Sequence, residues 1–178
     1  MDDFADALGS TDARGQLSRL MDRLDELSEH DVVHTAIGLH PDEPVGMCAS
    51  LFSLAVQRTD HDNPRVAVAR TALAMAGPEP RTGSTRRFLD LPSSLPCCLV
   101  AGTLATPGSE QRVFQVRVAM AHAESPYIVV LALISASLQH AEAYTDILEA
   151  ITHTVGFTDP GSSPHRAARP SRISEVLL

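Results

Sequence analysis

Two neighbouring cysteines, Cys97 and Cys98, are the residues in this chain whose types and spacing first suggest chemistry. Paired thiols could bind a metal ion or take part in redox chemistry, and a single activated thiolate could act as a nucleophile. The residues that follow, 98 to 105, have the composition of a β-strand, in which consecutive side chains point to opposite faces. The sequence therefore predicts that the two thiols do not share one ligand.

The remaining cysteine, Cys48, offers no metal-binding or redox motif either, because the chain contains no Cys-x-x-Cys spacing. We expect all three thiols to pack as small apolar side chains in the cytoplasm, where thiols stay reduced. The alternative is a catalytic thiolate at Cys97 or Cys98, which needs a nearby histidine that the sequence cannot place.

Histidines and carboxylates give no metal site by their spacing. His34 and His40 fall on one face of a predicted strand but about 20 Å apart, given a rise of about 3.3 Å per residue, so they cannot share an ion. A second group forms one stripe of the last predicted helix, opposite its apolar side, and is interpreted as a solvated face: Glu142, Asp146, Glu149 and His153. We predict neither a metal nor a cofactor.

An arginine-rich segment is the candidate for binding a small anion. It mixes guanidinium groups, hydroxyls and a glycine, and its basic residues are Arg81, Arg86 and Arg87. Because neither a glycine-rich phosphate motif nor a following helix start accompanies it, the sequence favours a solvated, mobile surface loop over an anion site. An enzyme or small-ligand protein would need these arginines to converge with a titratable group such as Cys98 or a histidine.

Composition excludes several activities. The chain has 178 residues and a net charge of −8, and all 14 of its basic residues are arginine. Without lysine it can have no Walker-A lysine and no Schiff-base lysine. Its acidity argues against general nucleic-acid binding, and no apolar run reaches the roughly 20 residues of a membrane helix. We expect a cytoplasmic protein, and the arginine bias suggests a GC-rich, actinobacterial source.

The elements that must position these residues follow from periodicity and turn signals. A helix ends near residue 29, and two strands, 32–39 and 47–58, form a hairpin across a Pro- and Gly-containing turn at 40–46. Asp62 or Asn63 caps a helix over 63–76, which Gly77 stops. A long surface connection over 77–96 then leads to three strands and a last helix, at 98–105, 112–121, 127–136 and 139–155.

Together these elements predict an α+β fold, with a largely antiparallel five- to six-stranded sheet covered by helices in the order α-β-β-α-β-β-β-α. We expect a single domain over residues 11–158, between an N-terminal tail at 1–10 and a flexible basic tail at 159–178. In the middle strand of the later three, apolar residues alternate with others, which predicts one core face and one partly wet face. The last helix should bury one stripe: Tyr144, Ile147, Leu148, Ile151 and Val155.

Two apolar features are candidates for contacting another protein. The first helix carries a stripe at three- and four-residue spacing, made of Leu17, Leu20, Met21, Leu24 and Leu27. The C-terminal end is apolar and follows a polar tether, as in a docking peptide, through Ile173, Val176, Leu177 and Leu178. The partner would be another protein or a second copy of this chain.

Residues 88–157 resemble the second half of the PsbP-like fold, including the actinobacterial LpqN-type proteins. The likeness is carried by Phe-Leu-Asp-Leu-Pro, by Leu-Val-Ala-Gly-Thr-Leu, and by two further apolar strands that lead into the final helix. The resemblance implies an antiparallel sheet between helices and a non-catalytic role in binding other proteins. It implies no catalytic residues. The sequence therefore favours a protein-binding or adaptor module, including a small chaperone-like protein, over an anion-binding protein or enzyme.

Overall fold

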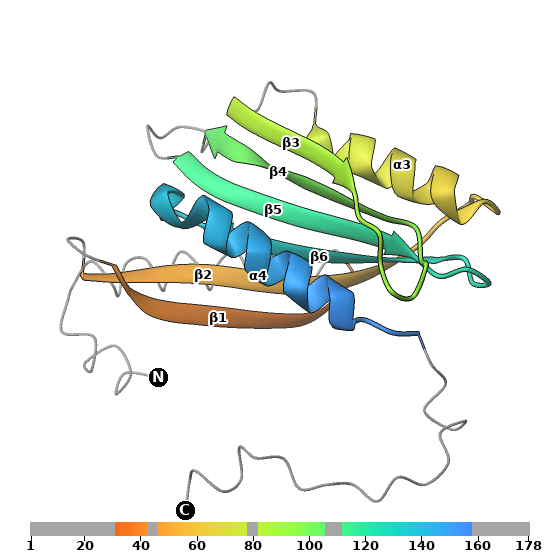
Figure 1. Cartoon of the computed structure of the whole chain (residues 1–178), viewed down its shortest axis with the longest axis horizontal. Helices are drawn as coiled ribbons and strands as arrows, with labels where there is room; N and C mark the ends of the chain where they lie inside the picture. The colour runs from red at the N-terminus through yellow and green to blue at the C-terminus, as the bar shows by residue number, and fades with distance from the viewer. Residues whose placement is uncertain (1–30, 43–45, 78–81, 106–111, 158–178) are drawn as a thin grey trace, which may run out of the picture.

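A six-stranded antiparallel sheet forms the centre of the computed structural model, which describes residues 31–42, 46–77, 82–105 and 112–157 (Figure 1). Every neighbouring pair of strands is antiparallel, and the spatial order is β1-β2-β6-β5-β4-β3. The strands are β1 (Val32–Asp42), β2 (Gly46–Arg58), β3 (Thr82–Phe88), β4 (Cys97–Ala105), β5 (Arg112–Ala121) and β6 (Tyr127–Ser135). The α+β class and the antiparallel sheet are therefore confirmed.

Helices cover the two faces of the sheet. The helix α4 (Ala141–Thr154), preceded by the 3₁₀ turn η1 (Leu138–His140), lies in front of the sheet in Figure 1. Leu148 of α4 packs in one core cluster with Val116 and Leu131. The helix α3 (Pro64–Ala76) packs on the opposite face, where Val68 shares a second cluster with Ala119. Among the described residues, no helix is long and apolar enough to cross a membrane.

The connection predicted over 77–96 is wrong in part, because residues 82–88 form β3. This strand pairs with β4 at the end of the sheet, and the residues from Gly83 to Phe88 are all exposed. Since both of its faces meet solvent, its sequence shows no apolar alternation, which is the signal that identifies a half-buried strand. The register of β3 shifts between Thr82 and Thr85, around Gly83, whose φ is 65°. The left-handed backbone at Gly83 favours glycine at this bulge.

Two burial predictions also need correction. On the second face of β5, Ala119 packs against α3 and is fully buried, and Gln115 on the same face is only 3% exposed. In α4, Ile147 is 49% exposed, whereas Thr152 is fully buried. Thr152 can be buried because its hydroxyl donates a hydrogen bond of 2.7 Å to the carbonyl of Leu148. The buried stripe of α4 is therefore rotated away from Ile147.

The start of α3 follows the predicted signals. Pro64 occupies its first turn, and the side chain of Asn63 accepts hydrogen bonds from the backbone N–H groups of Arg65 and Val66, at 3.0 and 3.4 Å. Gly77 ends the helix with a φ of 65°. Of the two predicted caps, Asn63 is the one that the structure uses.

Replacing the cap, Asn63→Ala, is expected to lower the free energy of unfolding by about 1 kcal/mol, because two N–H groups at the helix start lose their acceptor. The matched control is Asp62→Ala, which alters the neighbouring exposed residue and should change that free energy by less than about 0.5 kcal/mol. Urea denaturation of both variants measures the difference. A larger loss for Asp62→Ala than for Asn63→Ala would contradict this assignment.

Candidate functional site

The two adjacent cysteines point to opposite faces of the sheet, as predicted. Cys97 is 1% exposed and belongs to the cluster under α4, whereas Cys98 is 3% exposed and belongs to the cluster under α3. Burial raises the pKa of Cys97 to about 12, with smaller contributions from Cys98 and Glu149, and burial also raises the pKa of Cys98. Both groups are thiols near neutral pH, so neither is arranged as a thiolate nucleophile.

The two arginines of the proposed anion site that the structure describes do not converge. Arg86 and Arg87 are consecutive residues of β3, so their side chains point to opposite faces of the sheet. Arg87 forms an ion pair with Glu149 of α4, and Arg86 is near enough to Cys98 to influence its pKa. Arg81 lies outside the described residues. Arg86 and Arg87 therefore do not form, by themselves, the cluster of guanidinium groups that an anion site would need.

The predicted protein-binding residues cannot be placed, because they lie outside the described ranges. This applies to both apolar features, the helix stripe of Leu17, Leu20, Met21, Leu24 and Leu27 and the C-terminal end of Ile173, Val176, Leu177 and Leu178.

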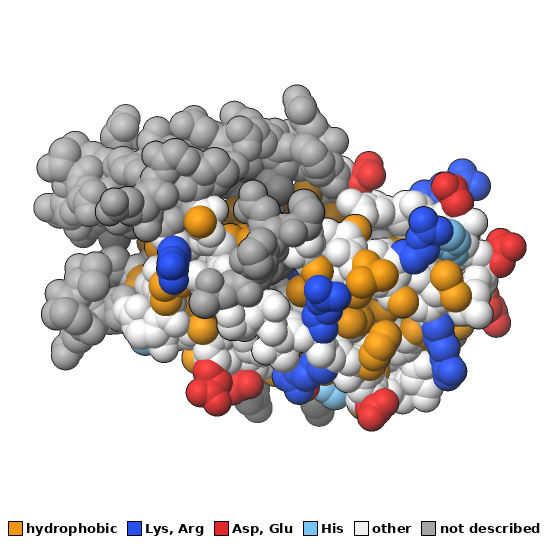
Figure 2. All heavy atoms as spheres, turned by 90° about the horizontal axis from the view of Figure 1, so that it is seen from above, with side chains coloured by type: hydrophobic (Ala, Val, Ile, Leu, Met, Phe, Trp, Pro, Cys, Tyr) orange, Lys and Arg blue, Asp and Glu red, His pale blue; other side chains and the backbone are white. Residues whose placement is uncertain are grey.

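An exposed apolar surface lies instead at the β3 side of the molecule. Figure 2, which looks down on the upper side of Figure 1 where β3 and α3 lie, shows hydrophobic side chains interspersed with basic ones. Phe88 at the end of β3 is 70% exposed, and Leu73 on the outer side of α3 is 62% exposed. The β3 edge of the sheet therefore presents an aromatic side chain to solvent together with two arginines.

Two surface depressions lie at the opposite end of α3 from Gly77. One has a volume of about 620 Å³ and is lined by residues that include Asn63, Arg65 and Ser94. The other, of about 260 Å³, is lined by residues that include His61 and His122. Neither is lined by Cys97, Cys98 or the β3 arginines. Neither depression therefore brings the arginines of β3 together with a titratable group, as the enzyme hypothesis requires.

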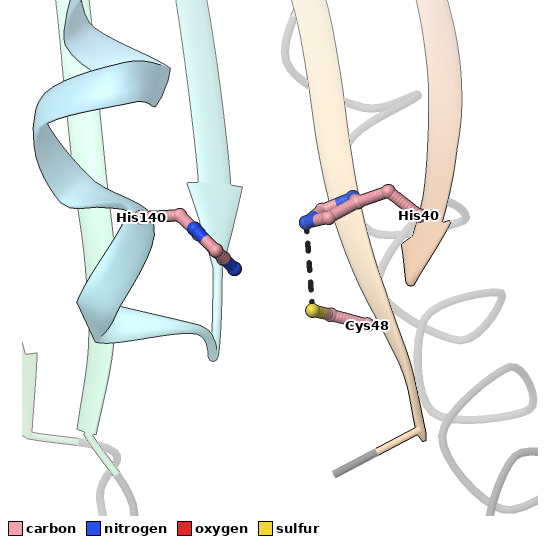
Figure 3. A group of neighbouring side chains, drawn as sticks. All are labelled: His40, Cys48 and His140. Atoms are coloured by element: carbon pink, nitrogen blue, oxygen red, sulfur yellow. Dashed lines mark hydrogen bonds between the residues drawn. The ribbon is translucent and has the colours of Figure 1, made fainter. Parts of the chain in front are cut away.

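Three side chains that sequence spacing does not group, His40, Cys48 and His140, meet at one end of the sheet (Figure 3). The register of the β1–β2 hairpin places His40 directly opposite Cys48, so both side chains leave the same face. The Nε2 atom of His40 lies 3.4 Å from the Sγ atom of Cys48. His140, the last residue of η1, brings its ring centroid to 5.5 Å from that of His40.

Tyr144, in the first turns of α4, connects this cluster to the core. Its hydroxyl oxygen lies 2.7 Å from Nε2 of His40, and its ring packs edge-on against both histidine rings. The hydroxyl of Ser135, at the end of β6, donates to the carbonyl oxygen of Ala49 at 2.9 Å, and its oxygen lies 3.1 Å from the Tyr144 hydroxyl oxygen. Tyr144 and Cys48 are buried, and both histidines are half-buried. The result is a largely desolvated polar cluster at the edge of an apolar core.

Sequence reasoning missed this cluster for two reasons. It ended the first strand at residue 39, although β1 continues to Asp42, and it compared His40 only with His34 and not with Cys48 on the neighbouring strand. His140 is a hundred residues away along the chain, and only the packing of α4 on the sheet brings it near. A longer hairpin would have paired His40 with Cys48, but no local signal connects His140 to either residue.

The comparisons with known proteins bear on the fold alone. No family model and no curated protein matches the sequence. The structure is similar to the crystal structure of PA94 from Pseudomonas aeruginosa, a protein of unknown function that is described as a candidate regulator. The TM-score is 0.51 at 12% sequence identity, and the match covers 71% of this chain and 84% of that chain. At this identity the likeness indicates a shared α+β fold.

Proposed function

We propose that this protein is a non-catalytic protein-binding module in which an extended segment of the partner pairs with the outer edge of β3. The observation that carries the proposal is Phe88, an aromatic side chain that is 70% exposed on a strand at the end of the sheet. Within the described ranges β3 pairs only with β4, so its other edge offers backbone N–H and C=O groups to an incoming strand.

The side chains of β3 define the chemistry of the partner. Arg86 and Phe88 are two residues apart, so they point to the same face, and both are exposed. An added strand would place alternate side chains beside them. A partner segment with one acidic and one apolar residue at this spacing would pair its carboxylate with Arg86 and cover the ring of Phe88. Arg87, already paired with Glu149, contributes less to this contact.

The resemblance to PsbP-like and LpqN-type proteins supports the same role, since it implies binding of other proteins. The succession of β4, β5, β6 and α4 is compatible with that resemblance. We retain as further proposals a cytoplasmic location, which suits three cysteines that form no disulfide, and an actinobacterial source. The apolar stripe of residues 17–27 and the C-terminal end at 173–178 remain proposed contact surfaces, for another protein or for a second copy of the chain.

Site-specific photo-cross-linking in the cells that produce the protein tests the proposal. A photoreactive phenylalanine analogue replaces Phe88 in one full-length variant and Ile147, an exposed residue of α4, in the matched control. We expect a discrete cross-linked protein at position 88, none at 147, and loss of the adduct when Arg86→Glu is added. Equal adducts at both positions, or none at 88, would refute binding at the β3 edge.

A further inference from the structure

The cluster of His40, Cys48 and His140 has the composition of a transition-metal site. One ligand atom from each residue lies within 4.8 Å of the others. Two imidazoles and a thiolate suit Zn²⁺ and other borderline or soft ions, and they are poor ligands for Ca²⁺ and Mg²⁺, which prefer oxygen. The cluster is separate from the β3 edge, so its function does not depend on the proposed partner contact.

The distances within the cluster are close to those of a tetrahedral centre. Zn–S and Zn–N bonds of about 2.3 and 2.0–2.1 Å, at tetrahedral angles, place sulfur and nitrogen about 3.6 Å apart. Nε2 of His40 and Sγ of Cys48 are 3.4 Å apart. The ligand atom of His140 lies within 4.8 Å of the other two, so it has to approach by no more than about 1.5 Å to reach tetrahedral distances. His140 is half-buried at the start of a helix, where rotation of its side chain can supply this movement.

The support for each ligand comes from a different element, as Figure 3 shows. His40 and Cys48 are fixed by the ladder of the β1–β2 hairpin, and His140 is fixed by the junction of η1 and α4. A metal ion bound by all three would therefore tie the end of the hairpin to the helix that covers the sheet. Ligands on three elements are close together only in the folded protein, so binding would stabilise the fold.

Tyr144 marks the position of a fourth ligand. Its hydroxyl lies 2.7 Å from Nε2 of His40, the same nitrogen that contacts Cys48, and the ring is 4% exposed. An ion held between that nitrogen and the sulfur would have the phenol next to its remaining coordination position, where the hydroxyl can contact the ion or a water bound to it. Ser135, whose hydroxyl oxygen lies 3.1 Å from that of Tyr144, holds the Tyr144 hydroxyl in place.

We propose that His40, Cys48 and His140 bind one transition-metal ion, best matched by Zn²⁺, with Tyr144 beside the fourth coordination position. The bound thiolate balances one of the two charges of the ion, and its formation releases the thiol proton to solvent.

Titration of the chelator-treated full-length protein with Co²⁺ and then Zn²⁺ tests this assignment. We expect one Co²⁺ per chain, with the visible bands of tetrahedral cobalt and a thiolate-to-cobalt charge-transfer band, and displacement of the cobalt by one Zn²⁺. Cys48→Ser should abolish the charge-transfer band. His140→Asn should weaken Zn²⁺ binding at least about tenfold, and Tyr144→Phe, which removes the hydroxyl beside the ion, should weaken it by about 10- to 100-fold.

Two matched variants separate this site from other histidines and thiols. His34→Asn changes an exposed histidine on the same face of β1, and Cys97→Ser changes a thiol on β4, and both should leave the cobalt spectrum unchanged. Zn²⁺ should raise the melting temperature of the unmodified protein and of His34→Asn, but not that of His140→Asn, whose half-buried position lets the variant fold. Absence of a thiolate–cobalt band in the unmodified protein, or a band that survives Cys48→Ser, would overturn the proposal and leave a hydrogen-bonded cluster without a metal-binding role.

Discussion

Leu148→Ala is expected to lower the free energy of unfolding by about 2–5 kcal/mol, the range measured for deleting a buried leucine side chain. Leu148 is fully buried, and it belongs to the core cluster in which Val118 and Leu131 of the sheet are also buried. Alanine would leave a cavity between α4 and the sheet that the surrounding strands, held by their hydrogen-bond ladders, could fill only in part. Urea denaturation with an unchanged m value would measure the loss as a change of stability.

The matched control is the adjacent residue. Ile147 is 49% exposed, so Ile147→Ala should change the free energy of unfolding by no more than about 0.5 kcal/mol, since little packing is lost and alanine favours helix. The pair of variants also tests the rotation of α4, because the periodicity of the sequence places both residues on the buried stripe. Equal losses for the two substitutions would mean that the helix buries the face that the sequence predicts and not the face described here.

The elements predicted correctly are those whose signals are local or periodic. The helix α3 is bounded by a capping residue, a proline in its first turn and a glycine after its last, and each of these acts on the backbone within a few residues. Strand β4 is recognisable as a short, nearly continuous run of apolar residues, and β5 and β6 are recognisable by their valines and isoleucines. These signals come from residues close together in the sequence, so they can be recognised without knowing how the chain folds.

The strand that was missed, β3, owes its conformation to its neighbour. Its residues from Thr82 to Phe88 include a glycine, a serine and two arginines, and none of its positions from Gly83 onward is buried. Pairing with β4 supplies the hydrogen bonds that keep this segment extended. An edge strand of this kind carries no apolar pattern, so periodicity could not distinguish it from a loop. The anion-site hypothesis treated Arg86 and Arg87 as loop residues for the same reason.

The candidate metal site shows the same limit at the level of side chains. The pairing of His40 with Cys48 depends on the exact register of a hairpin, and a difference of one residue would send one of the two side chains to the other face. The approach of His140 depends on how α4 packs across the sheet. Sequence could supply the residue types, but only the tertiary arrangement brings them within bonding range of one ion.

Alkylation of Cys97 at pH 8 is expected to be about a thousandfold slower in the folded protein than in the unfolded chain. Burial raises its pKa from 9.0 to about 12, so the reactive thiolate falls from about a tenth of the molecules to about one in ten thousand. The side chain is also only 1% exposed, which restricts access of the reagent. Iodoacetamide labelling with and without denaturant, followed by peptide mapping, measures the two rates. Comparable rates in both states would contradict the buried position of Cys97.

The same pKa shift predicts how stability depends on pH. The folded chain keeps the Cys97 proton up to about pH 12, whereas the unfolded chain loses it near 9.0, so between these values the folded state binds more protons. The contribution of the Cys97 thiol to the free energy of unfolding is therefore fully present below about pH 9 and is lost as the pH rises toward 12. Cys97→Ala lacks this ionisation, so its free energy of unfolding should fall less steeply than that of the unmodified protein between pH 9 and 11. Urea denaturation at several pH values measures the free energy of unfolding of both proteins. If it falls equally steeply with pH in the two, Cys97 ionises alike in the folded and unfolded states, and the predicted pKa shift is wrong.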